Sequence, residues 1–60
     1  MTVEEWIKYP EPISPQVANK WLREHGRSLV YYAEEYESFW GKEFDINNIM
    51  SNEVFGLLGY

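Results

Sequence analysis

Residues 14–41, SPQVANKWLREHGRSLVYYAEEYESFWG, decide the fold because they contain two helix patterns separated by a three-residue turn. Ser14 is a good N-cap, and Pro15 stands at the first helical position, where its missing N–H costs nothing. Gly26 supplies a C-terminal stop after His25. Apolar residues recur between these signals at helical spacing: Val17, Ala18, Trp21 and Leu22. The pattern predicts a helix over residues 15–25.

A second helix is predicted over residues 29–40, with Ser28 as its N-cap and Gly41 at its end. An amphipathic stripe runs along it: Leu29, Tyr32, Ala33, Tyr36, Phe39 and Trp40. The residues at 30–32 have strand-like propensity, so a strand is the competing interpretation of the first few positions. The run is too long for one strand and its period does not alternate, which favours a helix.

The N-terminal segment shows a short helix signal followed by a break. Thr2 and Glu5 have the spacing of a capping box, which predicts a short helix through about Tyr9. The prolines in residues 10–12 then require an extended connector, since a proline biases the preceding residue away from helix. We expect this connector to act as a tether.

The C-terminal segment is ambiguous. Asp45 is a plausible cap for a helix that would place Ile46, Ile49 and Met50 on one face. A further helical pattern follows Ser51, but Gly56 and Gly59 weaken it. The pattern leaves open whether residues 46–58 form one kinked helix or two.

These segments predict a small all-α domain of three to four short helices built around an antiparallel helical hairpin. Residues 1–60 form a single domain. Within it, residues 1–13 are an N-terminal turn and Pro-rich connector, 14–41 are the hairpin, and 45–60 are one or two short helices.

Aromatic residues account for 11 of the 60 residues. A chain of this length buries only about 60% of the surface that its unfolded form exposes, so its core cannot hold that much ring surface easily. We therefore expect some rings to build the core and others to form a surface patch that another molecule covers.

The net charge of the chain favours some classes of binding partner over others. The formal net charge is −5, which disfavours direct binding to nucleic acid or to an anionic membrane and favours a basic protein surface. The chain has no cysteine, no secretory signal and no apolar run of bilayer length, so we expect a cytoplasmic protein with no membrane contact.

No catalytic, metal-binding or cofactor-binding motif is recognised. His25 is the only histidine, and a helix-end cap or core edge is its expected role. A calcium-loop interpretation of residues 45–56 fails, because Met50 and Gly56 occupy the positions of the required glycine and glutamate. Residues 15–40 resemble a helix-turn-helix in spacing, but the second helix has no residue suited to reading bases. We expect no enzymatic activity.

The candidate partner-binding residues are aromatic side chains and carboxylates: Tyr31, Glu34, Glu35, Glu37, Trp6 and Tyr60. Tyr31 lies one position off the apolar stripe, beside the acidic residues. For Trp6 we favour a place in the core. Tyr60 does not belong to any apolar stripe of the predicted helices. The carboxylates have three interpretations, namely a solubilising face, a docking surface for a basic partner, or a DNA mimic.

The sequence therefore favours a small acidic protein–protein interaction module, an inhibitor or adaptor that binds a larger protein. The alternative is a self-associating structural or regulatory protein that uses the same patch to form homodimers. A DNA mimic that blocks a nucleic-acid-binding partner is the third hypothesis.

Overall fold

The computed structural model describes residues 2–60 and confirms a small all-α domain, 59% helical, with principal extents of 27 × 22 × 21 Å. Its helices are α1 (Val3–Lys8), α2 (Pro15–Glu24), α3 (Leu29–Trp40) and α4 (Ser51–Leu57). Two short strands, β1 (Pro12–Ile13) and β2 (Ile49–Met50), complete the elements of this part of the chain.

The helix starts follow the predicted caps. The hydroxyl of Ser14 accepts a hydrogen bond from the Val17 N–H at 3.2 Å, and that of Ser28 accepts one from Tyr31 at 3.1 Å. Thr2 and Glu5 form the expected capping box of α1. These side chains satisfy N–H groups that have no partner within the first turn of a helix. Local sequence alone therefore sets where α1, α2 and α3 begin.

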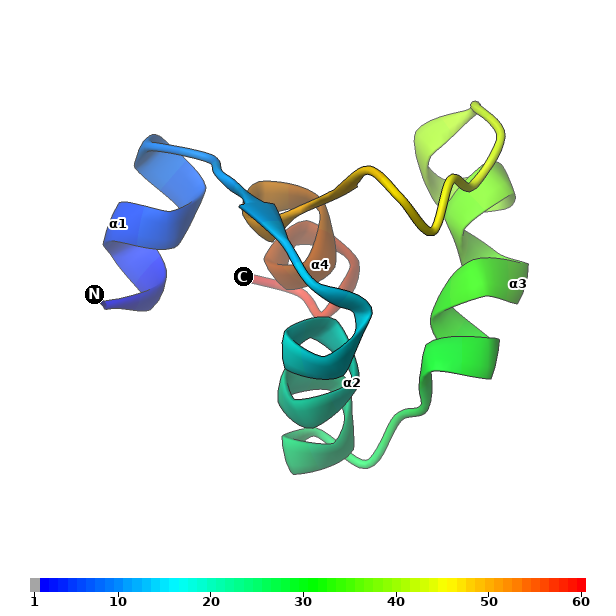
Figure 1. Ribbon diagram of the computed structural model, residues 1–60, viewed down its shortest axis with the longest axis horizontal. Coiled ribbons are helices and arrows are strands. Elements are labelled where there is room, and N and C mark those ends of the chain that lie inside the picture. Colours follow the sequence, from blue (N-terminus) through cyan, green and yellow to red (C-terminus); the bar gives the residue numbers. More distant parts are fainter. Residues whose placement is uncertain (1) are drawn as a thin grey trace.

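The helices α2 and α3 run in opposite directions, as the predicted hairpin requires (Figure 1). The turn between them depends on Gly26, whose φ of +72° is left-handed. The Arg27 N–H donates to the Leu22 carbonyl at 2.8 Å, which completes a Schellman motif. The turn thus ends α2 and starts α3 within three residues.

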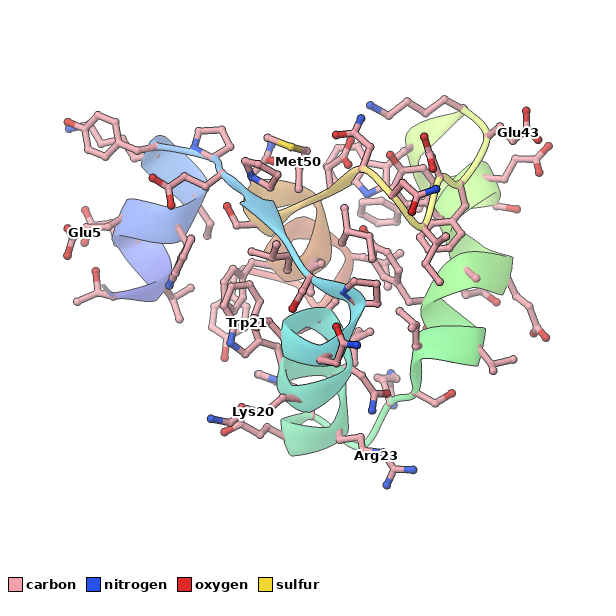
Figure 2. The ribbon with its side chains drawn as sticks, viewed as in Figure 1. Glu5, Lys20, Trp21, Arg23, Glu43 and Met50 are labelled. Carbon is pink, nitrogen blue, oxygen red and sulfur yellow. The ribbon has the colours of Figure 1, made fainter. Side chains whose placement is uncertain are left out.

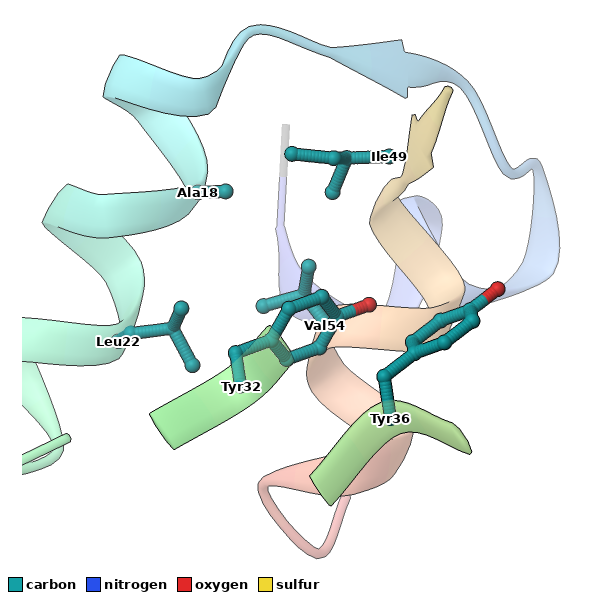
Figure 3. Close-up of a cluster of buried hydrophobic side chains, with 6 residues drawn as sticks. All are labelled: Ala18, Leu22, Tyr32, Tyr36, Ile49 and Val54. Atoms are coloured by element: carbon teal, nitrogen blue, oxygen red, sulfur yellow. The ribbon is translucent and has the colours of Figure 1, made fainter. Parts of the chain in front are cut away.

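α4 lies in the middle of the molecule and packs against each of the other three helices. α1 and α3 lie on opposite sides of it in Figure 1. The buried core forms where α2, α3, β2 and α4 meet (Figure 3). Its buried members are Ala18, Leu22, Tyr32, Tyr36, Ile49 and Val54.

The helical interpretation of residues 46–50 is wrong. Asp45 does not cap a helix; its Oδ1 accepts from the Asn47 N–H at 2.9 Å, and its carbonyl accepts from Asn48 at 3.0 Å. This local turn competes with helix formation, as Asp side chains often do. The following residues form β2, so α4 is the single helix of the C-terminal segment.

β2 pairs with β1 in an antiparallel arrangement, with Ile13 opposite Ile49 and Pro12 opposite Met50. The connector at residues 10–12 is extended, as expected, but it is part of a sheet and not a free tether. Pairing β1 with β2 places Ser51, the first residue of α4, beside Glu11, the residue before β1. The strand pair therefore sets the position of α4 inside the hairpin.

Ser51, the first residue of α4, connects this helix to α1 and to the residue before β1. Its hydroxyl donates to the Trp6 carbonyl at 2.8 Å and accepts from the Glu11 N–H at 3.0 Å. The Ser51 N–H donates to the Glu11 carbonyl at 2.9 Å. Ser51 is completely buried, so these groups have no water to replace a lost partner.

The two C-terminal glycines do not weaken α4. A Cβ on Gly56 would lie 2.8 Å from the Trp40 ring, so glycine at this position lets α3 approach α4 closely. Gly59, with φ of +98°, completes a second Schellman motif, in which the Tyr60 N–H donates to the Phe55 carbonyl at 3.0 Å. Gly56 thus allows α3 and α4 to pack closely, and Gly59 ends α4.

We predict that Ser51→Ala lowers the free energy of unfolding by about 2 kcal/mol, because it leaves the Glu11 N–H and the Trp6 carbonyl unpaired. For a domain of this size the melting temperature should fall by about 10 °C in circular dichroism. Ser38→Ala, an exposed serine of α3, is the control and should change stability little. Equal effects of the two substitutions would contradict the role of Ser51.

We predict that Gly56→Ala lowers the free energy of unfolding by about 1–3 kcal/mol, because the added methyl group meets the Trp40 indole. The same substitution should cost much less in a Trp40→Phe background, where the smaller ring leaves room. Urea unfolding of the four proteins measures this coupling. If Gly56→Ala costs the same in both backgrounds, the close approach is not its cause.

Candidate functional site

The exposed side of α3 carries a mixed apolar and acidic surface. We call it the α3 face and define it by Val30, Tyr31, Glu34, Glu35, Glu37 and Phe39. Val30 is 68% exposed, Phe39 55% and Tyr31 36%, and the three glutamates are also exposed. The face therefore presents apolar side chains among carboxylates.

The α-helical period arranges these residues in two rows. Tyr31, Glu35 and Phe39 follow one another at four-residue intervals along one side of the helix. Val30, Glu34 and Glu37 form the second row. The buried Tyr32 and Tyr36 lie next to the first row, on the core side of the helix, and fix α3 to the core, so the backbone under both rows is held in place.

The apolar spacing of α3 predicts that Phe39 belongs to the core stripe, and this prediction is wrong. Phe39 and Trp40 are consecutive, so only one of them can point at the centre of the core. Trp40 packs against the core cluster, and Phe39 lies outside it with its ring edge-on to Trp40 at 5.0 Å. Two adjacent aromatic residues at the end of an apolar stripe thus indicate that one of the two rings is exposed.

Two arginines border the α3 face at its N-terminal end. The Arg27 guanidinium lies over the Tyr31 ring, 5.2 Å from its centroid. Arg23, Arg27 and Tyr31 line a surface hollow at the turn between α2 and α3. Arg23 extends away from the end of α2 into solvent (Figure 2). The face is therefore positive at this end and negative along the rest of the helix.

Trp6 and Tyr60 do not lie on the α3 face. Trp6 meets Trp21 edge-on, with ring centroids 5.2 Å apart, and Trp21 stacks on Phe55 at 4.6 Å. Tyr60 contacts the other edge of this group, with its ring 5.6 Å from that of Phe55. The six predicted residues therefore divide into four on α3 and two in a separate aromatic group.

His25 holds Tyr60 in this second group. Its Nδ1 lies 2.9 Å from the Trp21 carbonyl oxygen, which accepts only, so Nδ1 carries the hydrogen. In the neutral ring Nε2 then accepts from the Tyr60 hydroxyl at 2.8 Å. His25 is the C-cap of α2, in line with the helix-end role expected from the sequence.

The second group borders a cleft of about 240 Å³ between α1, α2 and α4, which we call the aromatic cleft. Its lining residues are Val3, Trp6, Trp21, Glu24, His25 and Phe55. Trp21 is labelled in Figure 2, where it lies on the side of α2 toward α1. The sequence analysis does not identify this cleft, because it depends on contacts between helices that are distant in the sequence.

A buried acid joins the end of α3 to α4. Glu53 is 6% exposed, and its Oε2 lies 2.7 Å from the Lys42 Nζ. The hydrogen bond to this carboxylate raises the pKa of Lys42. Burial raises the pKa of Tyr36, and Glu53 adds to the effect. The ion pair holds the loop after α3 against α4, so its role is structural.

Tyr32 is completely buried, and its hydroxyl has no hydrogen-bond partner among the described residues. Burial is the main cause of a strong rise in the pKa of Tyr32, and the nearby Glu53 and Tyr36 raise it further. The side chain therefore fills the core as an apolar ring whose hydroxyl is under-satisfied.

Within residues 2–60 no group of three or more His, Cys, Asp or Glu side chains is placed to hold a metal ion. No helix in the same range has the length and apolar character needed to cross a membrane. Comparison of the chain with protein-family models, with curated proteins and with solved structures finds no match. Functional inference therefore rests on the two surfaces described above.

We predict that Tyr32→Phe raises the free energy of unfolding at pH 7 by about 1 kcal/mol, because it removes the under-satisfied hydroxyl. The raised pKa of Tyr32 means that the folded state holds this proton more tightly than the unfolded chain. The stability that comes from this bound proton is complete below about pH 10 and is lost as the pH rises further.

The advantage of Tyr32→Phe should therefore widen above about pH 10, which urea unfolding at pH 7, 9, 10 and 11 measures. Lys42 and Tyr36 still titrate in the variant. The free energy of unfolding of Tyr32→Phe should therefore also fall at alkaline pH, but by less than that of the wild type. Tyr9→Phe, an exposed tyrosine, is the control. A difference between wild type and Tyr32→Phe that does not change with pH would contradict the prediction.

Proposed function

We propose that this chain is a small acidic protein-binding module, an inhibitor or adaptor, whose α3 face docks on a basic surface of a larger protein. The observation that carries the proposal is the exposure of Phe39, Val30 and Tyr31 among three glutamates on one anchored helix. Aromatic side chains provide much of the contact energy in protein interfaces, and the charges around them provide specificity and rapid association.

The α3 face is suited to binding because it is ordered before a partner arrives. Tyr32 and Tyr36 anchor α3 in the core, and the Lys42–Glu53 ion pair holds the loop that follows it. A partner therefore does not have to fold this helix on contact, which lowers the entropy lost on association.

The available area sets the extent of the interface. A standard interface takes about 800 Å² from each partner, which is about a fifth of the 4126 Å² of accessible surface of this molecule. The loop leaving α3 exposes Glu43, Asp45 and Ile46, and it extends the same mixed surface. We infer that the interface includes this loop as well as α3.

Charge favours a foreign partner over a second copy of the chain. The sequence of α3 contains three glutamates and no Lys or Arg. Two α3 faces laid against each other would bring like charges together, with the bordering Arg23 and Arg27 of each copy to offset them only in part. A basic surface on another protein has no such penalty, and we therefore place the homodimer second.

The first test compares aromatic side chains on opposite sides of the molecule. Tyr31→Ala and Phe39→Ser should each weaken capture of the partner from a host lysate by about tenfold, because each removes an apolar anchor. Tyr9→Ala removes a ring that is 60% exposed at the end of α1 and should leave capture unchanged. Circular dichroism checks that all three variants fold.

The second test concerns the carboxylates and uses the partner so identified. The triple variant Glu34→Gln, Glu35→Gln, Glu37→Gln should slow association roughly tenfold at low salt and leave dissociation nearly unchanged. Added salt should slow the wild type toward the rate of the variant.

Three results would contradict the proposal. These are loss of capture on Tyr9→Ala without loss on the α3 variants, an association rate that does not respond to salt, and a concentration-independent dimer in sedimentation equilibrium. The last result would support the homodimer.

A further inference from the structure

The aromatic cleft has the composition of a site for an organic cation. Its walls include the Trp6 and Trp21 indoles, whose planes meet at 60° with centroids 5.2 Å apart. The Phe55 ring also lines the cleft, where it is buried and stacks on Trp21. Aromatic faces attract cations through their quadrupole, and Trp does so most strongly.

The charged residues around the cleft also favour an organic cation. Glu24 lines it and is exposed, so a carboxylate stands at its border. His25 is the only other lining residue that titrates, and both of its ring nitrogens already have partners within the protein. Lys20, one residue before Trp21, is the nearby cation on α2, and it extends from that helix into solvent in Figure 2.

The hydrogen-bonding groups select among cations. A primary ammonium group has three N–H donors, and a guanidinium has five. The side chains that line the cleft offer few acceptors, because an indole N–H only donates and the His25 nitrogens are engaged. Glu24 supplies the one free carboxylate. A methylated ammonium group, which has few or no N–H donors, meets these conditions with the least loss of hydration.

The volume sets the size of the ligand. At about 240 Å³ the cleft lies below the usual 300–1,000 Å³ range of pockets for drug-sized molecules. It therefore suits a compact head group and not an extended ligand.

From these observations we propose that the aromatic cleft binds a methylated ammonium group, held by the Trp6 and Trp21 rings and the Glu24 carboxylate. Such a group occurs as a free quaternary ammonium compound or as a methylated lysine side chain of another protein. The site lies between α1, α2 and α4, so it is distinct from the α3 face. Either proposal can fail without affecting the other.

The test uses the three indole N–H signals in NMR titrations of the full chain. Trp6 and Trp21 lie in the cleft, whereas Trp40 packs against Gly56 of α4 and serves as an internal reference. Choline should shift the Trp6 and Trp21 signals saturably and leave Trp40 unchanged. Its neutral isostere, 3,3-dimethylbutan-1-ol, should bind about tenfold more weakly, because it keeps the shape and lacks the charge.

Two charge variants separate the role of Glu24 from a general effect of charge. Glu24→Gln should weaken choline binding severalfold, and Glu35→Gln, which removes the same charge from α3, should not. Trp6→Leu should abolish the shift of Trp21. Because that substitution also removes packing against α2, the Glu24 pair keeps the test valid if Trp6→Leu unfolds.

A peptide containing trimethyllysine, compared with its unmodified form, identifies the source of the ligand. Tighter binding of the methylated peptide than of choline assigns the cleft to a protein partner, and comparable binding assigns it to a free compound. Equal shifts with choline and its neutral isostere, equal shifts at all three tryptophans, or no saturable shift with choline would overturn the proposal.

Discussion

The hydroxyl of Ser51 joins backbone groups that are 40 and 45 residues away in the sequence, and the positions of three helices depend on it. Proline has no N–H, so Glu11 carries the one backbone donor of residues 10–12, and Ser51 accepts it. The same side chain fixes the end of α1 through the Trp6 carbonyl. With α1 and β1 held in this way, α4 fills the space inside the α2–α3 hairpin. The outward side of α3 is then left without a partner in the chain.

The chain compensates for its small core with aromatic contacts. Tyr32 and Tyr36 of the core contact each other and the adjacent Phe44 at centroid distances of 5.5–5.6 Å. Trp21 and Phe55 belong to the second group, where α1, α2 and α4 meet. Ring pairs of this kind stabilise a structure beyond the area that they bury. In a domain without disulfides, rings therefore provide stability as well as exposed surface.

The parts of the fold that local chemistry determines were predictable, and those that depend on distant contacts were not. Caps and glycines locate α2 and α3 almost to the residue, because each acts within one helical turn. Residues 46–50 have an apolar pattern that suits a helix, but a local turn at Asp45 and the pairing of Ile49 and Met50 with β1 prevent one. The same limit applies to the candidate site. Tyr31 and the glutamates share one helix and could be grouped from the sequence, whereas the meeting of Trp6 with Trp21 needs the tertiary fold.

In both proposals the surface would attract positive groups, but through different physics, and this argues for different roles. The carboxylates of α3 stand in water, where salt screens them beyond about 10 Å, so they act mainly on the rate of encounter. The aromatic cleft acts at contact distance on a group that has lost its water, where screening is weak and shape matters. A net charge of −5 attracts cations to the whole molecule without choosing among them. Selectivity must therefore come from the short-range contacts, namely apolar complementarity to Phe39 and Tyr31 on one side and the inclined indoles of Trp6 and Trp21 on the other.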